Sequence, residues 1–121
     1  MTTADDFAGH LARVRDRFAA RLPARIDESE KAIDPEAADP IEAVIVAHRR
    51  LHEMCGVAPT LGFAETGTAA RAAETVVRVP AKEHRLLTES ERTAFVEKIA
   101  TLRQIASREL QQVQPVQGAT A

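Results

Sequence analysis

Apolar side chains recur at intervals of three or four residues through most of this 121-residue chain, which is the spacing of one face of an α-helix. The first stripe contains Phe7, Leu11, Val14, Phe18, Leu22 and Ile26. The second stripe, on the segment 39–61, contains Val44, Ala47, Leu51, Met54, Ala58 and Leu61. A helix with such a stripe buries it against neighbouring helices. The pattern therefore predicts a bundle of packed helices.

Two further helices complete the predicted set. The third is expected to run from Phe63 to Val77 and to end before Pro80, and the fourth covers roughly residues 88–113. Thr88 and Glu91 have the spacing of a capping box, in which two side chains reciprocally bond backbone N–H groups at a helix start. Aromatic residues make up only 3% of the chain, so there is little strand signal. Short connections favour antiparallel neighbours, and the predicted fold is all-α, an up-down four-helix bundle.

Proline and glycine positions give the expected helix boundaries. Pro23 interrupts the first stripe, so we expect a kink or a break into two abutting helices, which would add an N-terminal helix. Asp39 before Pro40 suits a helix start, and Gly62 suits a left-handed cap at the end of the second helix. Pro59 lacks an N–H, so the second helix is expected to bend there. We expect one domain over residues 1–121, with a disordered tail from about residue 114.

Charge and composition exclude several function classes. The net charge of −2 gives no electrostatic case for nucleic acid. No apolar run approaches the length of a membrane span, and the acidic, polar N-terminus does not resemble a signal peptide. A single cysteine, Cys55, rules out an internal disulfide and suits a reducing compartment. We therefore expect a cytoplasmic protein that binds neither nucleic acid nor membrane.

One histidine on the second helix is a candidate functional residue. His52 lies one position from the buried seam, about 100° round the helix, and should point to the surface or rim of the bundle. Gly56 lies one turn later on the same face, although glycine costs a helix about 1 kcal/mol relative to alanine. An open flank beside the imidazole explains the glycine if a partner must approach closely. The alternatives are a solvated surface histidine, or a metal site shared with His48, for which no third ligand is near.

The stretch that contains this histidine resembles the motif of histidine-containing phosphotransfer (HPt) domains, His-x-x-Lys-Gly-x-Ala-x-x-Leu-Gly. From His52 to Gly62 the chain reads HEMCGVAPTLG, so the histidine, both glycines, the alanine and the leucine match in register. Glu74 has the spacing of a glutamate that the family usually carries near the end of the next helix. Two positions depart from the family: Cys55 stands where it often has lysine, and Pro59 falls late in the helix.

The resemblance implies a phosphotransfer protein of a multistep two-component phosphorelay. His52 would relay a phosphoryl group between aspartates of receiver domains. The implied partners are a response-regulator receiver domain and a hybrid histidine kinase. The receiver would supply Mg²⁺, so no cofactor and no metal site are expected on this chain. No nucleotide-binding motif is present, so autokinase activity is not expected. We expect a monomer.

Five residues are predicted to support transfer: Arg49, Cys55, Gly56, Arg71 and Glu74. Arg49 lies one turn before His52 and could partly replace the missing lysine. Arg71 is expected on the neighbouring helix, in the region of Glu74. Glu74 is expected to accept a hydrogen bond from Nδ1 of His52, which leaves Nε2 free. Cys55 in place of lysine keeps an alternative open, an HPt-like binding module that docks and regulates a receiver or kinase without carrying phosphate.

Overall fold

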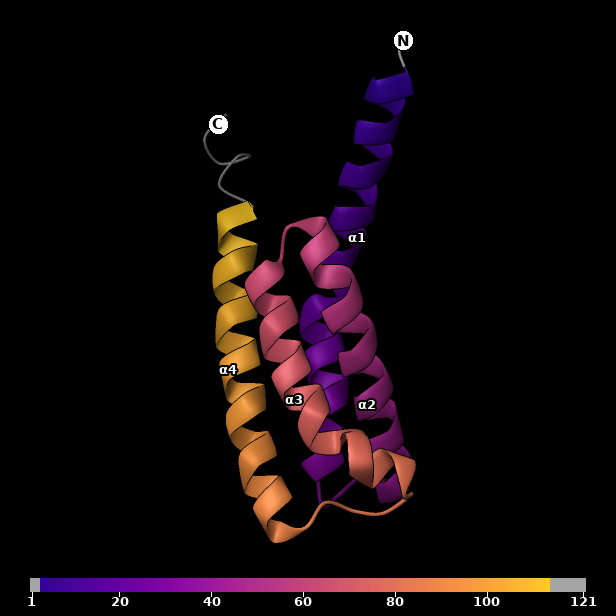
Figure 1. The fold of residues 1–121 in the computed structure, drawn as a ribbon, viewed down its shortest axis with the longest axis vertical. Coiled ribbons are helices and arrows are strands. Elements are labelled where there is room, and N and C mark those ends of the chain that lie inside the picture. Colours follow the sequence, from indigo (N-terminus) through magenta and orange to yellow (C-terminus); the bar gives the residue numbers. More distant parts are fainter. Residues whose placement is uncertain (1–2, 114–121) are drawn as a thin grey trace.

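The structure is a computed structural model of the chain and describes residues 3–113 (Figure 1). Its four α-helices are α1 (Thr3–Glu30), α2 (Pro40–Val57), α3 (Ala64–Lys82) and α4 (Glu89–Val113). Two 3-10 turns, η1 (Lys31–Ile33) and η2 (Ala58–Leu61), follow α1 and α2 directly. No strand occurs within residues 3–113. The all-helical prediction is confirmed, whereas the predicted tail from about residue 114 lies outside the described residues.

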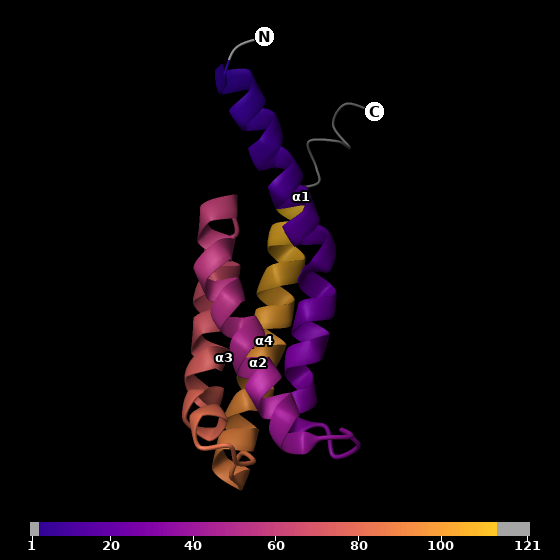
Figure 2. The same cartoon turned by 90° about the vertical axis from the view of Figure 1, so that its right-hand side faces the viewer.

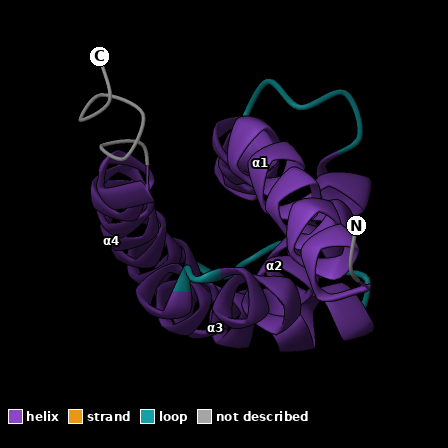
Figure 3. Cartoon of the chain, turned by 90° about the horizontal axis from the view of Figure 1, so that it is seen from above, coloured by secondary structure: helices purple, strands orange, loops and turns teal. Residues whose placement is uncertain are grey.

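The helices pack side by side along a common long axis (Figure 1). The α1–α2 and α3–α4 connections lie at the lower end of that view, and the α2–α3 connection lies at the upper end. The α2–α3 interface is the most extensive, and α1 contacts α4 less than it contacts α2. Viewed along the bundle, α1, α2, α3 and α4 follow one another in chain order (Figure 3). The first turns of α1 project beyond the ends of the other helices (Figure 2).

All four helices contribute their apolar stripes to the core. The largest fully buried members of this cluster are Leu22, Ile26, Val44, Leu51, Val77, Phe95, Ile99 and Leu102. A second cluster near the α2–α3 connection contains Ala58, Leu61 and Phe63, and Phe18 packs against it with its ring centroid 5.5 Å from that of Phe63. Phe7 and Leu11, the first members of the α1 stripe, are 67% and 38% exposed because they lie near the start of the helix that projects.

Two helices continue through prolines that were predicted to interrupt or end them. α1 is a single helix across Pro23, so the alternative of a break into two abutting helices is wrong. α3 includes Pro80 and ends at Lys82, so the predicted end before Pro80 is also wrong. In each case buried side chains lie on both sides of the proline. Leu22 and Ile26 around Pro23 are 1% and 2% exposed, and Val77 and Ala81 around the buried Pro80 are 0% and 7% exposed. Packing on both sides offsets the single hydrogen bond that a proline removes.

The predicted caps are present. Oδ1 of Asp39 accepts a hydrogen bond from the backbone N–H of Glu42 at 3.1 Å. Gly62 has φ = 93°, a left-handed conformation that favours glycine. Thr88 and Glu91 form the capping box, with the Thr88 N–H donating to Glu91 at 2.8 Å and the Glu91 N–H donating to Thr88 at 3.1 Å. The change from α2 to the 3-10 turn η2 at Ala58 agrees with the bend predicted near Pro59.

The start of α3 is capped from a different helix. Phe63, at its N-cap position, makes no side-chain cap. Instead, the carboxylate of Glu109 on α4 accepts hydrogen bonds from the backbone N–H groups of Glu65 and Thr66 at 3.2 and 2.8 Å, and from Thr66 Oγ1 at 2.6 Å. Thr66 and Glu109 are both buried. This carboxylate therefore fixes α4 against the α2–α3 connection, close to the end of the helix that carries His52.

Candidate functional site

α2 presents His52 to solvent. Its neighbours Leu51 and Met54 are 0% and 3% exposed and belong to the core, whereas His52 is exposed. Among the described residues, no side chain forms a hydrogen bond or ion pair with the His52 ring, and its backbone carbonyl accepts a hydrogen bond from Cys55 Sγ at 3.2 Å. Both ring nitrogens of His52 are therefore open to an approaching molecule.

Packing within the chain does not explain Gly56. A Cβ atom built at this position would meet no atom within 4 Å, and Gly56 does not have the positive φ that favours glycine. Gly67 on α3 is different, because a Cβ atom there would lie 2.8 Å from Cγ of Pro59. The fold therefore requires a small residue at position 67 and not at position 56. Gly56 leaves an open helical surface one turn from His52.

The second histidine of α2 is held by a buried carboxylate. His48 Nε2 lies 2.8 Å from Oε2 of Glu74 on α3, and Glu74 is 2% exposed. Arg78, one turn after Glu74, donates to Oε1 at 2.9 Å and to Oε2 at 3.2 Å. The prediction that Glu74 bonds His52 is therefore wrong, since its partners are His48 and Arg78. The reason is rotational: four residues along an α-helix add about 40° beyond a full turn. His48 faces α3, and His52 is turned toward solvent.

The charges around Glu74 keep its carboxyl group ionised. Hydrogen bonding to Arg78 lowers the pKa of Glu74, and the smaller effect of His48 acts in the same direction, while burial opposes both. The net shift is downward, so the carboxyl group is ionised at neutral pH. An ionised carboxylate accepts a hydrogen bond but cannot donate one. His48 therefore carries a proton on Nε2, which is not free to act as a nucleophile.

The two histidines lie against each other on α2. Their ring centroids are 6.0 Å apart, with an angle of 28° between the ring planes. Glu74 is therefore linked to His52 only indirectly, because its carboxylate bonds the His48 ring and that ring is the one beside His52. Sequence reasoning treated His48 as a metal candidate at most and did not single out Arg78. The four-residue spacing of Glu74 and Arg78 was a usable signal, whereas the contact between His48 and Glu74 depends on how α2 packs against α3.

None of the other predicted supporting residues forms a hydrogen bond or ion pair with the ring of His52. Arg49 and Arg71 are exposed on α2 and α3, and neither guanidinium group forms an ion pair within the described residues. Cys55 is 7% exposed and belongs to the core, with its thiol directed to the His52 carbonyl. Cys55 thus acts as a small packing residue. Position 55 therefore supplies no cation, and Arg49, exposed one turn before His52, is the charged side chain that could take the role of the motif's lysine.

Two further searches of the described residues and three comparisons with known proteins were negative. Within residues 3–113, no group of three His, Cys, Asp or Glu side chains could hold a metal ion. None of the helices in that range is both long enough and apolar enough to cross a membrane. Comparison with models of protein families, with curated proteins and with solved structures finds no match.

Proposed function

We propose that the chain is a histidine phosphotransfer protein of a multistep phosphorelay and that His52 carries the phosphoryl group. The observation that carries the proposal is the contrast between two histidines one turn apart. His48 has its Nε2 bonded to Glu74, whereas the His52 ring is exposed and has no hydrogen-bond partner among the described residues. Gly56, which packing does not require, leaves room for a partner beside His52.

The arrangement of the helices supports the same proposal. The connections between successive helices lie at alternating ends of the molecule (Figure 1). We infer an up-down four-helix bundle, the architecture that the HPt-like motif from His52 to Gly62 implies. In such a bundle the histidine is presented on the outer side of a helix, where a folded receiver domain can reach it.

The proposed reaction needs only an exposed nucleophile from this chain. The lone pair on Nε2 of His52 attacks the phosphorus of an aspartyl phosphate on a receiver domain. An N–P bond forms, the P–O bond to the aspartate breaks, and the aspartate leaves as a carboxylate. The same step in reverse passes the group to a second receiver. Transfer of this kind depends on in-line positioning and on stabilisation of the phosphoryl charge, for which the receiver supplies Mg²⁺.

Glu74 and His48 are positioning residues in this proposal. The carboxylate of Glu74 holds the His48 ring, and that ring lies against His52. The partners are a receiver domain and a hybrid histidine kinase of the cytoplasm, and the chain has no autokinase activity of its own.

The contacts of the site also favour a second candidate function. Cys55 is buried, and neither Arg49 nor Arg71 is bonded to the ring of His52. A site that lacks the lysine of the motif at position 55 stabilises a phosphoryl group less well. The alternative is an HPt-like module that docks on a receiver or histidine kinase and regulates it without being phosphorylated.

A transfer assay separates the two functions. The chain is incubated with Mg²⁺ and the receiver domains of its own cell, charged with acetyl phosphate, and the label is mapped by mass spectrometry under alkaline conditions. We expect a phosphoramidate on His52, stable in base and labile in acid. The variant His52→Gln should lose all labelling, while its stability changes by no more than about 0.5 kcal/mol because the position is exposed.

His48→Gln is the matched control, since it removes the other imidazole of the same helix. It should keep most of the labelling, and Glu74→Ala should slow labelling if the carboxylate positions the rings. Phosphate on His48, or full labelling of His52→Gln, would show that His52 is not the acceptor. Failure of every receiver to label the wild-type chain, with receiver binding retained, would support the binding module.

A further inference from the structure

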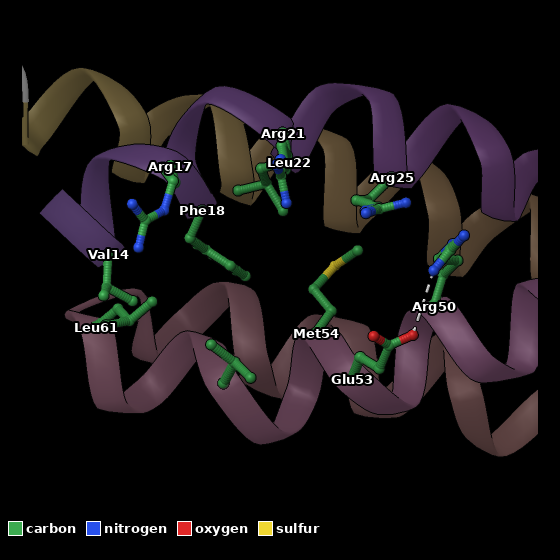
Figure 4. A pocket seen from close by; sticks show the side chains of 11 residues that line it. Val14, Arg17, Phe18, Arg21, Leu22, Arg25, Arg50, Glu53, Met54 and Leu61 are labelled. Carbon is green, nitrogen blue, oxygen red and sulfur yellow. Dashed lines mark hydrogen bonds and ion pairs between the residues drawn. The ribbon is translucent and has the colours of Figure 1, made fainter.

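A groove runs between α1 and α2, on a different face of α2 from His52. It encloses about 260 Å³. Its apolar lining consists of Val14, Phe18, Leu22, Met54, Val57 and Leu61. Figure 4 labels Val14, Phe18, Leu22, Met54 and Leu61 of this lining between the two helices. Of these side chains Val57 is 43% exposed, and Leu22, Met54 and Leu61 are buried. The groove is therefore a concave apolar surface that is open to solvent.

Arginines line the same groove. α1 contributes Arg17, Arg21 and Arg25, and α2 contributes Arg50 (Figure 4). Arg25 and Arg50 are partly neutralised by ion pairs to Glu28 at 3.0 and 3.3 Å. Arg50 also pairs at 3.4 Å with Glu53, a carboxylate that lines the same groove. Within the described residues, Arg17 and Arg21 form no ion pair. The end of the groove nearer the α1 N-terminus therefore carries two uncompensated positive charges beside an apolar floor.

The apolar surface continues beyond the groove. Phe7 and Leu11 precede Val14 and Phe18 at spacings of four, three and four residues, so all four lie on one face of α1. Phe7 and Leu11 lie in the N-terminal part of α1, which projects from the bundle, and are 67% and 38% exposed. From Phe7 to Leu22 the stripe is about 22 Å long, at 1.5 Å per helical residue. Nothing within residues 3–113 covers its outer half.

We propose that this surface binds an amphipathic helix of another protein, with the partner's apolar face in the groove and acidic side chains flanking it. The arginine spacing supports a helix. Arg17, Arg21 and Arg25 are one turn apart, about 6 Å of rise each, which matches carboxylates at every fourth position of a second helix. A single lipid would offer only one charged head group to this row of arginines. A membrane surface is flat, whereas this surface is concave.

A second copy of this chain fits less well. If two α1 helices paired in antiparallel fashion, the same flank of each helix would face the other. That flank carries Arg13 and Arg17 near the centre of the stripe, so like charges would meet there. An acidic helix from a different protein avoids this repulsion. Charge complementarity therefore selects a heterologous partner.

The groove is independent of the proposed phosphotransfer function. Met54, in the floor of the groove, lies two residues from His52, which places the two side chains about 160° apart around α2. A molecule on His52 and a helix on the groove floor would contact different faces of α2, and Glu53, about 100° from His52, lies at the edge of the groove between them. Binding in the groove should consequently be unaffected by the variant His52→Gln.

Two synthetic peptides provide the test. Both are 18-residue amphipathic helices of about the length of the stripe, with leucines at positions i, i+3, i+4 and i+7 of each repeat. One has glutamates on the flanks and the other has lysines. We expect the acidic peptide to bind at least about tenfold tighter in a fluorescence polarisation titration, with the difference shrinking at high salt because screening weakens exposed charge pairs. Amide resonances of Phe18, Met54 and Val57 should shift on binding.

Matched variants locate the site. Arg21→Glu should weaken binding of the acidic peptide at least about tenfold. Lys98→Glu makes the same charge change on the exposed surface of α4 and should leave the affinity within about twofold. Leu11→Ser should weaken both peptides while the helical circular dichroism signal is retained. Equal affinity for the two peptides, or equal effects of Arg21→Glu and Lys98→Glu, would overturn the proposal. So would a dimer by light scattering that Leu11→Ser dissociates, because the surface would then belong to a second copy.

Discussion

Removal of the Glu109 carboxylate should destabilise the bundle more than any other single change to a charged residue of α4. Glu109 belongs to the apolar side of α4, three residues after the buried Ala106, and is itself only 6% exposed. Its carboxylate accepts three hydrogen bonds at the start of α3, two of them from Thr66, which is 0% exposed. In the variant Glu109→Ala the backbone N–H and hydroxyl of Thr66 lose their acceptor in a place that water does not reach.

The expected loss follows from these donors. A buried donor left without a partner costs about 1–3 kcal/mol, and Thr66 contributes two such donors. The third donor, the N–H of Glu65, belongs to an exposed residue and can bond water instead. We therefore expect Glu109→Ala to lower the free energy of unfolding by about 3 kcal/mol, a large part of the ~5–15 kcal/mol typical of a domain. Glu109→Gln keeps an acceptor oxygen and should cost about 1 kcal/mol.

Urea unfolding, followed by the helical circular dichroism signal, measures the loss. The control is Glu97→Ala, the same substitution on the same helix at an exposed position, which should change stability by no more than about 0.5 kcal/mol. The dependence of the unfolding free energy on urea should stay the same in all variants, since the area exposed on unfolding hardly changes. A Glu109→Ala variant within about 1 kcal/mol of Glu97→Ala would refute the idea that this carboxylate caps α3.

Four further outcomes are expected. Gly67→Ala should destabilise the chain by about 1–3 kcal/mol, because its Cβ atom would lie 2.8 Å from Cγ of Pro59. Gly56→Ala should stabilise α2 by about 0.5–1 kcal/mol, because the new methyl group would contact no other atom within 4 Å. Thermal unfolding of Gly67→Ala and Gly56→Ala measures this contrast, and equal changes in stability of the two variants would contradict it. Gly56→Leu should fold as well as the wild type but slow labelling of the histidine by a phosphorylated receiver, and a wild-type transfer rate would count against the access role. The stability that the capping box gives to the start of α4 should depend on pH, because hydrogen bonding to Arg85 lowers the pKa of Glu91 from 4.5 to about 2. A carboxylate whose pKa is lower in the folded state stabilises it above the unfolded value, so the ~1 kcal/mol cost of Glu91→Gln at pH 7 should shrink between about pH 5 and pH 2 in urea titrations; a cost independent of pH would contradict this.

The helices themselves follow from local physics that can be recognised in the sequence. The apolar stripes predicted the buried faces because helical geometry repeats every three to four residues wherever the chain is placed. The caps at Asp39, Gly62 and Thr88 depend only on residues within one turn, so each was predictable. The exposure of His52 and the burial of Leu51 follow from the same periodicity.

The prolines are positions at which the local sequence did not predict the extent of a helix. Pro23 and Pro80 each remove one hydrogen bond, which predicts an interruption when the helix is considered alone. In the bundle, buried neighbours such as Leu22 and Ile26 keep the helix continuous, because most helix stability in proteins comes from packing. The extent of α1 and α3 was therefore decided by tertiary contacts.

Tertiary contacts also decided which side chains the buried carboxylates bond. Glu74 was expected to bond His52. Because of the way α2 is rotated against α3, the Glu74 carboxylate bonds His48 and Arg78 instead. Glu109 caps α3 from 43 residues away along the chain, a distance at which no local pattern operates. The sequence by itself determined which helices form and which faces they bury, because these depend on periodic, short-range geometry. Only the packing of the helices decided which histidine is held by a carboxylate and which is free, because that depends on how two helices are rotated against each other.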